Sequence, residues 1–130
     1  MVDFVTTPIA IGELFDKITI LEIKAERFVD ASKLANVERE LGALREIRDR
    51  DLSPSDELKS LGAELKGVNE EIWDLEDAIR DCERRGDFTD GFIVVARRIY
   101  RTNDRRAEVK RRINILLGSA IIEEKSYGEY

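Results

Sequence analysis

The chain has 130 residues, a formal net charge of −6 and no histidine, and 42% of its residues are hydrophobic. An acidic chain is not expected to bind nucleic acid generally, because a surface that neutralises phosphates is usually basic. No apolar run reaches the roughly eighteen residues that a membrane-spanning helix needs. This size and hydrophobic content predict one folded domain, 1–130, that needs no disulfide or metal.

The only cysteine, Cys82, lies on the apolar stripe of a predicted helix. A lone cysteine cannot form a disulfide within the chain, and a buried free thiol usually packs as a small hydrophobic side chain. The amino terminus has no basic segment followed by an apolar one, as a secretory leader would. We therefore expect a cytoplasmic protein.

The first half of the sequence predicts an extended arm and two helices. Residues 1–8 alternate weakly and end at a proline, which favours an extended segment. A first helix is expected over 11–28, and its apolar residues fall on two sides, so it should have neighbours on two faces. A second helix is expected over 32–51, because Asp30 and Ser32 offer capping oxygens at its start.

The second half predicts a long helical hairpin. A third helix is expected over 54–85, where apolar residues recur at alternating spacings of three and four. Gly86 interrupts this pattern, and a fourth helix is expected over 89–117 with Gly118 as its left-handed cap. Residues 119–130 form a tail without helical periodicity, which could pair with the amino-terminal arm.

The two arms of this hairpin carry opposite charge. Residues 56–83 contain ten acidic and three basic residues, a balance of −7, whereas residues 84–112 contain ten basic and four acidic residues, a balance of +6. Such pairs select neighbours more than they stabilise a fold. The predicted fold is all-α: an antiparallel bundle of four helices, with a long hairpin formed by the third and fourth and short extended arms at both termini.

Several polar side chains lie on or beside the apolar stripes of these helices. If the helices face one another, Glu22 and Glu76 should meet Arg106 and Lys110, while asparagines complete the hydrogen bonds. The full candidate cluster is Glu22, Asn69, Trp73, Glu76, Arg80, Asn103, Arg106, Lys110 and Asn114.

Two interpretations of the cluster are open. Buried polar groups must be paired and can fix the alignment of helices, so the cluster could be a structural network. It could instead line a small polar pocket in which Arg106 and Lys110, with Arg80, hold an anion.

Two classes of small helical enzyme resemble parts of the chain. The first helix looks like the opening helix of helical chorismate mutases in its apolar rhythm and its Arg27, but the usual early arginine is absent. Glu13-x-x-Asp16 and Glu70-Glu71-x-x-Asp74 resemble the acidic motifs of helical nucleotide pyrophosphohydrolases, which hold magnesium, but in a different order. The acids of the third helix fall mainly on its outward face. We therefore predict no metal site and no cofactor.

Five segments of the sequence are similar to a family of small bacterial proteins without a settled activity. The resemblance covers nearly the whole chain, and similar segments accompany carbohydrate-transfer or repeat-containing proteins. It therefore implies a bacterial origin and a surface-polysaccharide setting. The matching segments are Gly12–Lys24, Ile72–Arg80, Tyr100–Asp104, Lys110–Asn114 and Glu124–Tyr127.

These observations favour a non-catalytic interaction or assembly module. A helix of about thirty residues extends some 45 Å and overhangs a small monomer, so we expect a homodimer. A protein partner is also expected, but neither nucleic acid nor a membrane. The alternative is a small-molecule enzyme or anion-binding protein with a polar pocket between helices, similar to a mutase or to a magnesium-dependent nucleotide pyrophosphohydrolase.

Overall fold

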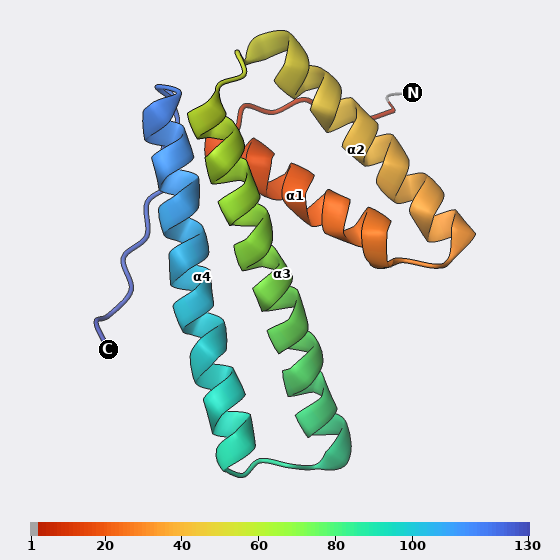
Figure 1. Ribbon diagram of the computed structural model, residues 1–130, viewed down its shortest axis with the longest axis vertical. Coiled ribbons are helices and arrows are strands. Elements are labelled where there is room, and N and C mark those ends of the chain that lie inside the picture. Colours follow the sequence, from red (N-terminus) through yellow and green to blue (C-terminus); the bar gives the residue numbers. More distant parts are fainter. Residues whose placement is uncertain (1–2) are drawn as a thin grey trace.

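The computed structural model describes residues 3–130 and contains four helices (Figure 1). The predicted all-α fold, with an antiparallel hairpin of the last two helices, is confirmed. The helices are α1 (Ile11–Arg27), α2 (Ala31–Asp51), α3 (Asp56–Arg85) and α4 (Asp90–Leu116).

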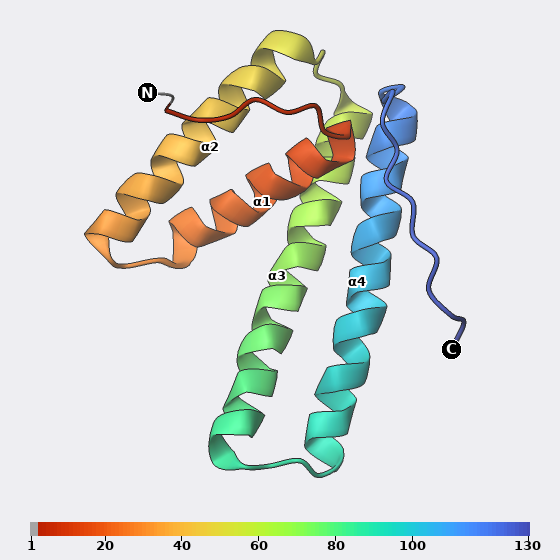
Figure 2. The ribbon, with the colours of Figure 1, turned by 180° about the vertical axis from the view of Figure 1, so that it is seen from behind.

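The first helix is the centre of the arrangement. The long helices α3 and α4 run side by side, and α1 crosses them at the end of the hairpin where α3 begins and α4 ends (Figures 1 and 2). On its other side α1 packs against α2. The expectation that this helix has neighbours on two faces is thus confirmed.

Two hydrophobic clusters follow from this position of α1. Leu14, Ile18 and Leu21 of α1 pack against Val37 and Leu41 of α2. A second cluster joins α1 to the hairpin through Phe15, Leu58, Leu61, Leu65, Val109 and Ile113. Because α1 supplies side chains to both clusters, it connects α2 to the hairpin.

The helix ends follow the local chemistry of their caps. Asp30 caps α2 as expected, accepting a hydrogen bond from the backbone N–H of Lys33 at 2.9 Å. The third helix begins at Asp56, two residues later than predicted, because the Ser55 side chain accepts from the Leu58 N–H. Gly86 and Gly118 have φ angles of 64° and 62°, a left-handed conformation that glycine adopts without strain.

Opposite charges join the arms of the hairpin, as their composition predicts. Arg98 and Arg105 of α4 both donate hydrogen bonds to Glu71 of α3. These pairs are largely exposed, so each contributes only a few tenths of a kcal/mol.

The described segments before α1 and after α4 lie on different sides of the molecule (Figure 2). The tail after α4 runs back along that helix, whereas the amino-terminal arm runs across α2 (Figure 2). Residues 3–130 contain no strand, so the suggested pairing of tail and arm is wrong for the described part. The same residues include no helix with both the length and the apolar character needed to cross a bilayer.

Candidate functional site

The most deeply buried charge in the protein is Asp16 of α1, whose residue is 1% exposed. Arg106 of α4 holds it through two hydrogen bonds, from Nε to Oδ1 at 2.9 Å and from Nη2 to Oδ2. Asn69 of α3 donates from Nδ2 to Asp16 Oδ1 at 3.0 Å and to Thr19 Oγ1 at 2.9 Å. One carboxylate therefore joins three helices.

Lys110 lies one turn further along α4 and is 8% exposed. Its Nζ donates to Glu13 Oε2 of α1 at 2.7 Å and to Glu123 Oε2 of the tail at 3.0 Å. Asp16 Oδ2 is 3.9 Å from the same Nζ, too far for a hydrogen bond but close enough for a strong charge interaction. Lys110 therefore connects the tail to the charges between α1 and α4.

The start of α1 is capped by other parts of the chain. Its N-cap residue, Ala10, offers no side-chain acceptor. The Gly12 N–H donates instead to Asn114 Oδ1 at 2.6 Å, and the Ile11 N–H donates to Ser119 Oγ at 3.2 Å. These oxygens satisfy two of the N–H groups that every helix leaves free at its start, so α4 and the tail complete α1.

Glycine at position 12 permits this contact. A Cβ atom there would lie 2.4 Å from the backbone oxygen of Lys110. No real Cβ contact is so short, and the obstacle is backbone that cannot rotate away. Gly12 therefore sets the approach of α1 to α4.

The charges of this site perturb one another. Burial raises the pKa of Asp16, but hydrogen bonds from Arg106 and Asn69 and the charges of Arg106 and Lys110 outweigh it, so the pKa lies below its ordinary 3.8. Burial lowers the pKa of Lys110, but its hydrogen bonds to Glu13 and Glu123 raise it above its ordinary value. Asp16 and Lys110 therefore both carry their charges near neutral pH.

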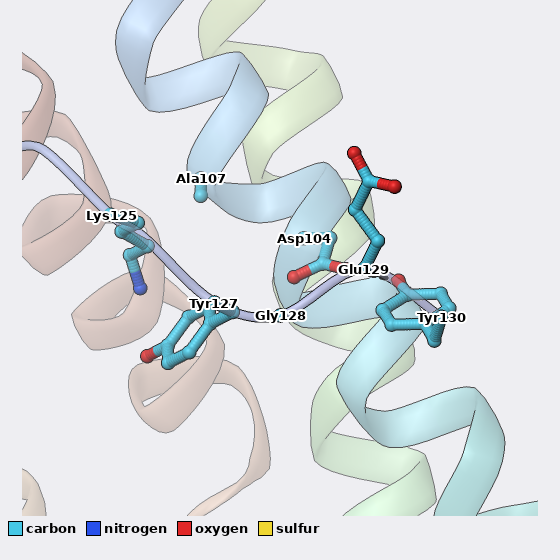
Figure 3. A pocket seen from close by; sticks show the side chains of 7 residues that line it. All are labelled: Asp104, Ala107, Lys125, Tyr127, Gly128, Glu129 and Tyr130. Carbon is cyan, nitrogen blue, oxygen red and sulfur yellow. Dashed lines mark hydrogen bonds between the residues drawn. The ribbon is translucent and has the colours of Figure 1, made fainter.

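The site is closed. Among the described residues, every buried side-chain nitrogen or oxygen has a hydrogen-bond partner. One hollow lies outside the site, between α4 and the end of the tail, where Asp104, Ala107, Lys125 and Tyr127 are among its lining residues (Figure 3). Tyr130 also lines this hollow, and its hydroxyl donates to Asp104. The arrangement therefore fixes the helices through polar groups that already have partners within the chain.

Four of the predicted residues meet at the site. They are Asn69, Arg106, Lys110 and Asn114. Their acidic partners are Asp16, Glu13 and Glu123, so the expected pairing of Glu22 and Glu76 with Arg106 and Lys110 is wrong.

The other predicted residues lie elsewhere. Glu22 accepts from Arg45 of α2 at 2.8 Å, because its side of α1 faces α2. Glu76 and Arg80 pair with each other on α3. Trp73 packs against Phe28, with ring centroids 6.0 Å apart, and Asn103 is half-buried on α4.

The residues that sequence reasoning missed had one usable signal. Gly12, Asp16, Thr19 and Ile23 recur at spacings of four, three and four, which places them on one face of α1. Small and polar residues on one line of an otherwise apolar helix indicate a close helix contact with a polar centre. Glu123 had no such signal, because the tail has no periodicity.

The acids that resemble a magnesium motif contact cations of the chain. Glu13 and Asp16 are paired with Lys110 and Arg106, as described above, while Glu71 binds Arg98 and Arg105. Asp74 pairs with Arg27 across the α1–α3 contact. Within residues 3–130 no group of three or more metal-ligating side chains converges.

Acid should weaken the fold through Asp16. Because the pKa of Asp16 is depressed in the folded state, its contribution is fully present above about pH 4 and is lost as the pH falls through the folded pKa. At pH values below about 4, we expect the urea concentration at the unfolding midpoint to decrease with pH in the wild type. The same midpoint should decrease less steeply in Asp16→Asn. An equally steep decrease in the two proteins would show that Asp16 does not cause the loss of stability in acid.

Comparison with known proteins identifies the family but no activity. Residues 5–129, which include the whole site from Gly12 to Glu123, match a family described as a family of unknown function, DUF6165. Neither the curated proteins nor the solved structures contain a match. Since the match covers nearly the whole chain, the protein belongs to this family of unknown function.

Proposed function

We propose that the protein is a non-catalytic assembly module that forms a homodimer through the far end of its α3–α4 hairpin. The closed polar site supports the first half of this proposal, because its charged groups are already paired with one another. The second half rests on an apolar surface that α1 leaves uncovered.

The α3–α4 hairpin extends beyond the end of α1, the helix that covers it. The last residue of α1, Arg27, pairs with Asp74, so about eleven residues of α3 lie beyond it, a length of about 17 Å. Figure 1 shows that α3 and α4 continue there as a two-helix arm. Two helices alone cannot bury an apolar stripe on all sides.

Burial changes along single lines of each helix. Leu65 is 0% and Val109 3% exposed, where α1 covers the hairpin. Ile79 lies fourteen residues after Leu65 on the same face of α3, and Val95 lies fourteen residues before Val109 on the same face of α4. Both are nearer the tip of the hairpin, and both are only half-buried. All four side chains are aliphatic, so the difference in burial follows from the absence of a third helix over the tip.

We call this uncovered surface the open face. Phe92 and Ile99 precede Arg106 by fourteen and seven residues, so they lie on the side of α4 that α1 covers further along. Ile93 at its edge is 50% exposed. The open face consists of Ile79, Phe92, Ile93, Ala96 and Ile99, which are half-buried or exposed.

A second copy of the chain is the occupant that fits this surface. Two hairpins whose open faces meet around a two-fold axis form a four-helix bundle, and each supplies the apolar surface that the other lacks. Each copy also has an acidic arm and a basic arm, with balances of −7 and +6, so its charge pattern is complementary to itself.

A pair of isoleucine substitutions on α4 tests the dimer. Ile93→Lys places a charge at the open face, whereas Ile115→Lys places the same charge at an isoleucine that is 62% exposed at the other end of the helix. We expect Ile93→Lys to weaken dimerisation by tenfold or more, about 1.4 kcal/mol, since it brings an unpaired charge into an apolar interface. Sedimentation velocity measures the association, and equal masses for the two variants would contradict the proposal.

The setting of the protein is also part of the proposal. The buried thiol of Cys82, which forms no disulfide, suits a reducing compartment such as the cytoplasm. The family resemblance of the sequence suggests a bacterial origin and a surface-polysaccharide setting. Deleting the chain should then alter the surface polysaccharide, and fractionation should recover the protein with cytoplasmic markers. Recovery with extracellular material would contradict this setting.

A further inference from the structure

We propose that Lys110 and Arg106 form a binding site for a small carboxylate anion, which the tail residue Glu123 occupies as an internal substitute. The inference does not depend on the dimer. It concerns the outer edge of the closed site, where a segment without regular structure supplies one of its ligands.

Charge balance singles out Glu123. Arg106 is neutralised by Asp16 through two hydrogen bonds, and Lys110 is neutralised by Glu13. These four groups come from helices and sum to zero. Glu123 is a fifth group and adds a negative charge that the other four do not require.

Lys110 nevertheless needs an oxygen at that position. Its side chain is 9% exposed, and an ammonium group has three hydrogens to donate. When Glu123 leaves, only the hydrogen bond to Glu13 remains, because Asp16 Oδ2 is 3.9 Å away. The ammonium group then has unused donors, which attract another carboxylate or ordered water.

The tail is fastened weakly enough to leave. Residues 119–130 have no regular backbone structure, and Ile121 and Ile122 remain 43% and 40% exposed. Its outer contacts, Arg111 with Glu124 and Asp104 with Tyr130, lie on the surface, where each contributes little. Release of the tail beyond Ser119, which caps the Ile11 N–H, therefore loses few buried contacts other than Glu123 itself.

The remaining charges select the class of anion. Asp16 and Glu13 stay beside Lys110, so an anion with two or more charges on one group, such as phosphate, would be repelled more strongly than a singly charged carboxylate. The Arg106 side chain is 30% exposed, and Nε and Nη2 are the two nitrogens that bind Asp16. Its third nitrogen, Nη1, offers donors to a second polar group of the ligand.

Two alanine variants of the tail test this site. Glu123→Ala removes the internal carboxylate, and Glu124→Ala removes its neighbour, which pairs only with the exposed Arg111 among the described residues. The probe is succinate, with neutral succinamide as the matched control. Backbone amide NMR spectra report both affinity and the position of the bound molecule.

We expect succinate to bind Glu123→Ala at least about tenfold more tightly than the wild type, because the intact tail keeps most molecules occupied. Glu124→Ala should behave as the wild type, succinamide should not bind, and shifts should centre on Glu13, Arg106 and Lys110. Equal affinity in the wild type and Glu123→Ala, no saturable shift, or shifts elsewhere would overturn the inference. Adding Lys110→Gln to Glu123→Ala should abolish the gain.

Discussion

Asp16→Ala is expected to destabilise the protein by about 3–5 kcal/mol, the largest effect of any substitution in the site. Asp16 is 1% exposed and accepts hydrogen bonds from Arg106 and Asn69. Its removal leaves a partly buried guanidinium without its carboxylate and a buried amide with one partner fewer, in addition to a cavity. Urea unfolding followed by circular dichroism measures this loss.

Asp74→Ala is the matched control. Asp74 also pairs with an arginine, Arg27, but its side chain is 68% exposed. Water can replace that partner, so the loss should stay below about 1 kcal/mol. Equal losses of stability in Asp16→Ala and Asp74→Ala would mean that burial does not strengthen the pair of Asp16 with Arg106.

The double variant Asp16→Leu, Arg106→Met tests whether each of these two charges is needed only because the other is present. Each single change leaves one charge without its partner between helices, whereas the double change removes both. We expect the double variant to be more stable than the sum of the single losses predicts, by about 1 kcal/mol or more. Simple additivity would contradict a paired network.

Gly12→Ala is expected to destabilise the protein by about 1–3 kcal/mol, although alanine favours helices. The added Cβ would lie 2.4 Å from the Lys110 backbone oxygen and 3.0 Å from Asn114 Oδ1. Relief requires α1 to move away from α4, which lengthens the hydrogen bond from the Gly12 N–H to Asn114. The loss of stability in Gly12→Ala therefore measures how much the close contact between α1 and α4 contributes.

Gly67→Ala supplies the opposite expectation. Gly67 lies in α3, and a Cβ there meets nothing within 4 Å. Alanine should stabilise that helix by about 0.5–1 kcal/mol, because glycine loses more backbone freedom on folding. Urea unfolding measures the stability of both variants. A Gly12→Ala variant more stable than the wild type would show that the close contact between α1 and α4 does not constrain the fold.

The fold could be predicted because its determinants are local. The three-and-four spacing of α3 repeats without interruption from Leu58 to Cys82, and Gly86 and Gly118 end the two long helices in the left-handed conformation that glycine favours. Asp30 and Ser55 cap the helices that follow them. Each of these signals lies within a few residues of the structure that it specifies.

The site could be predicted only in part, because it depends on how helices cross. The stripe of α4 correctly indicated Arg106, Lys110 and Asn114, which interrupt an apolar pattern. Asp16 and Glu22 both lie beside apolar positions of α1, and only the line of small and polar residues from Gly12 to Thr19 distinguishes Asp16 as their partner. The crossing of α1 turns Asp16 toward α4 and Glu22 toward Arg45 of α2.

Sedimentation equilibrium of the unmodified chain over a wide range of concentration tests the central claim most directly. If the open face of the hairpin docks a second copy, the mass should approach that of two chains and should fall toward one chain on dilution. A mass of one chain at every concentration would contradict the proposed assembly.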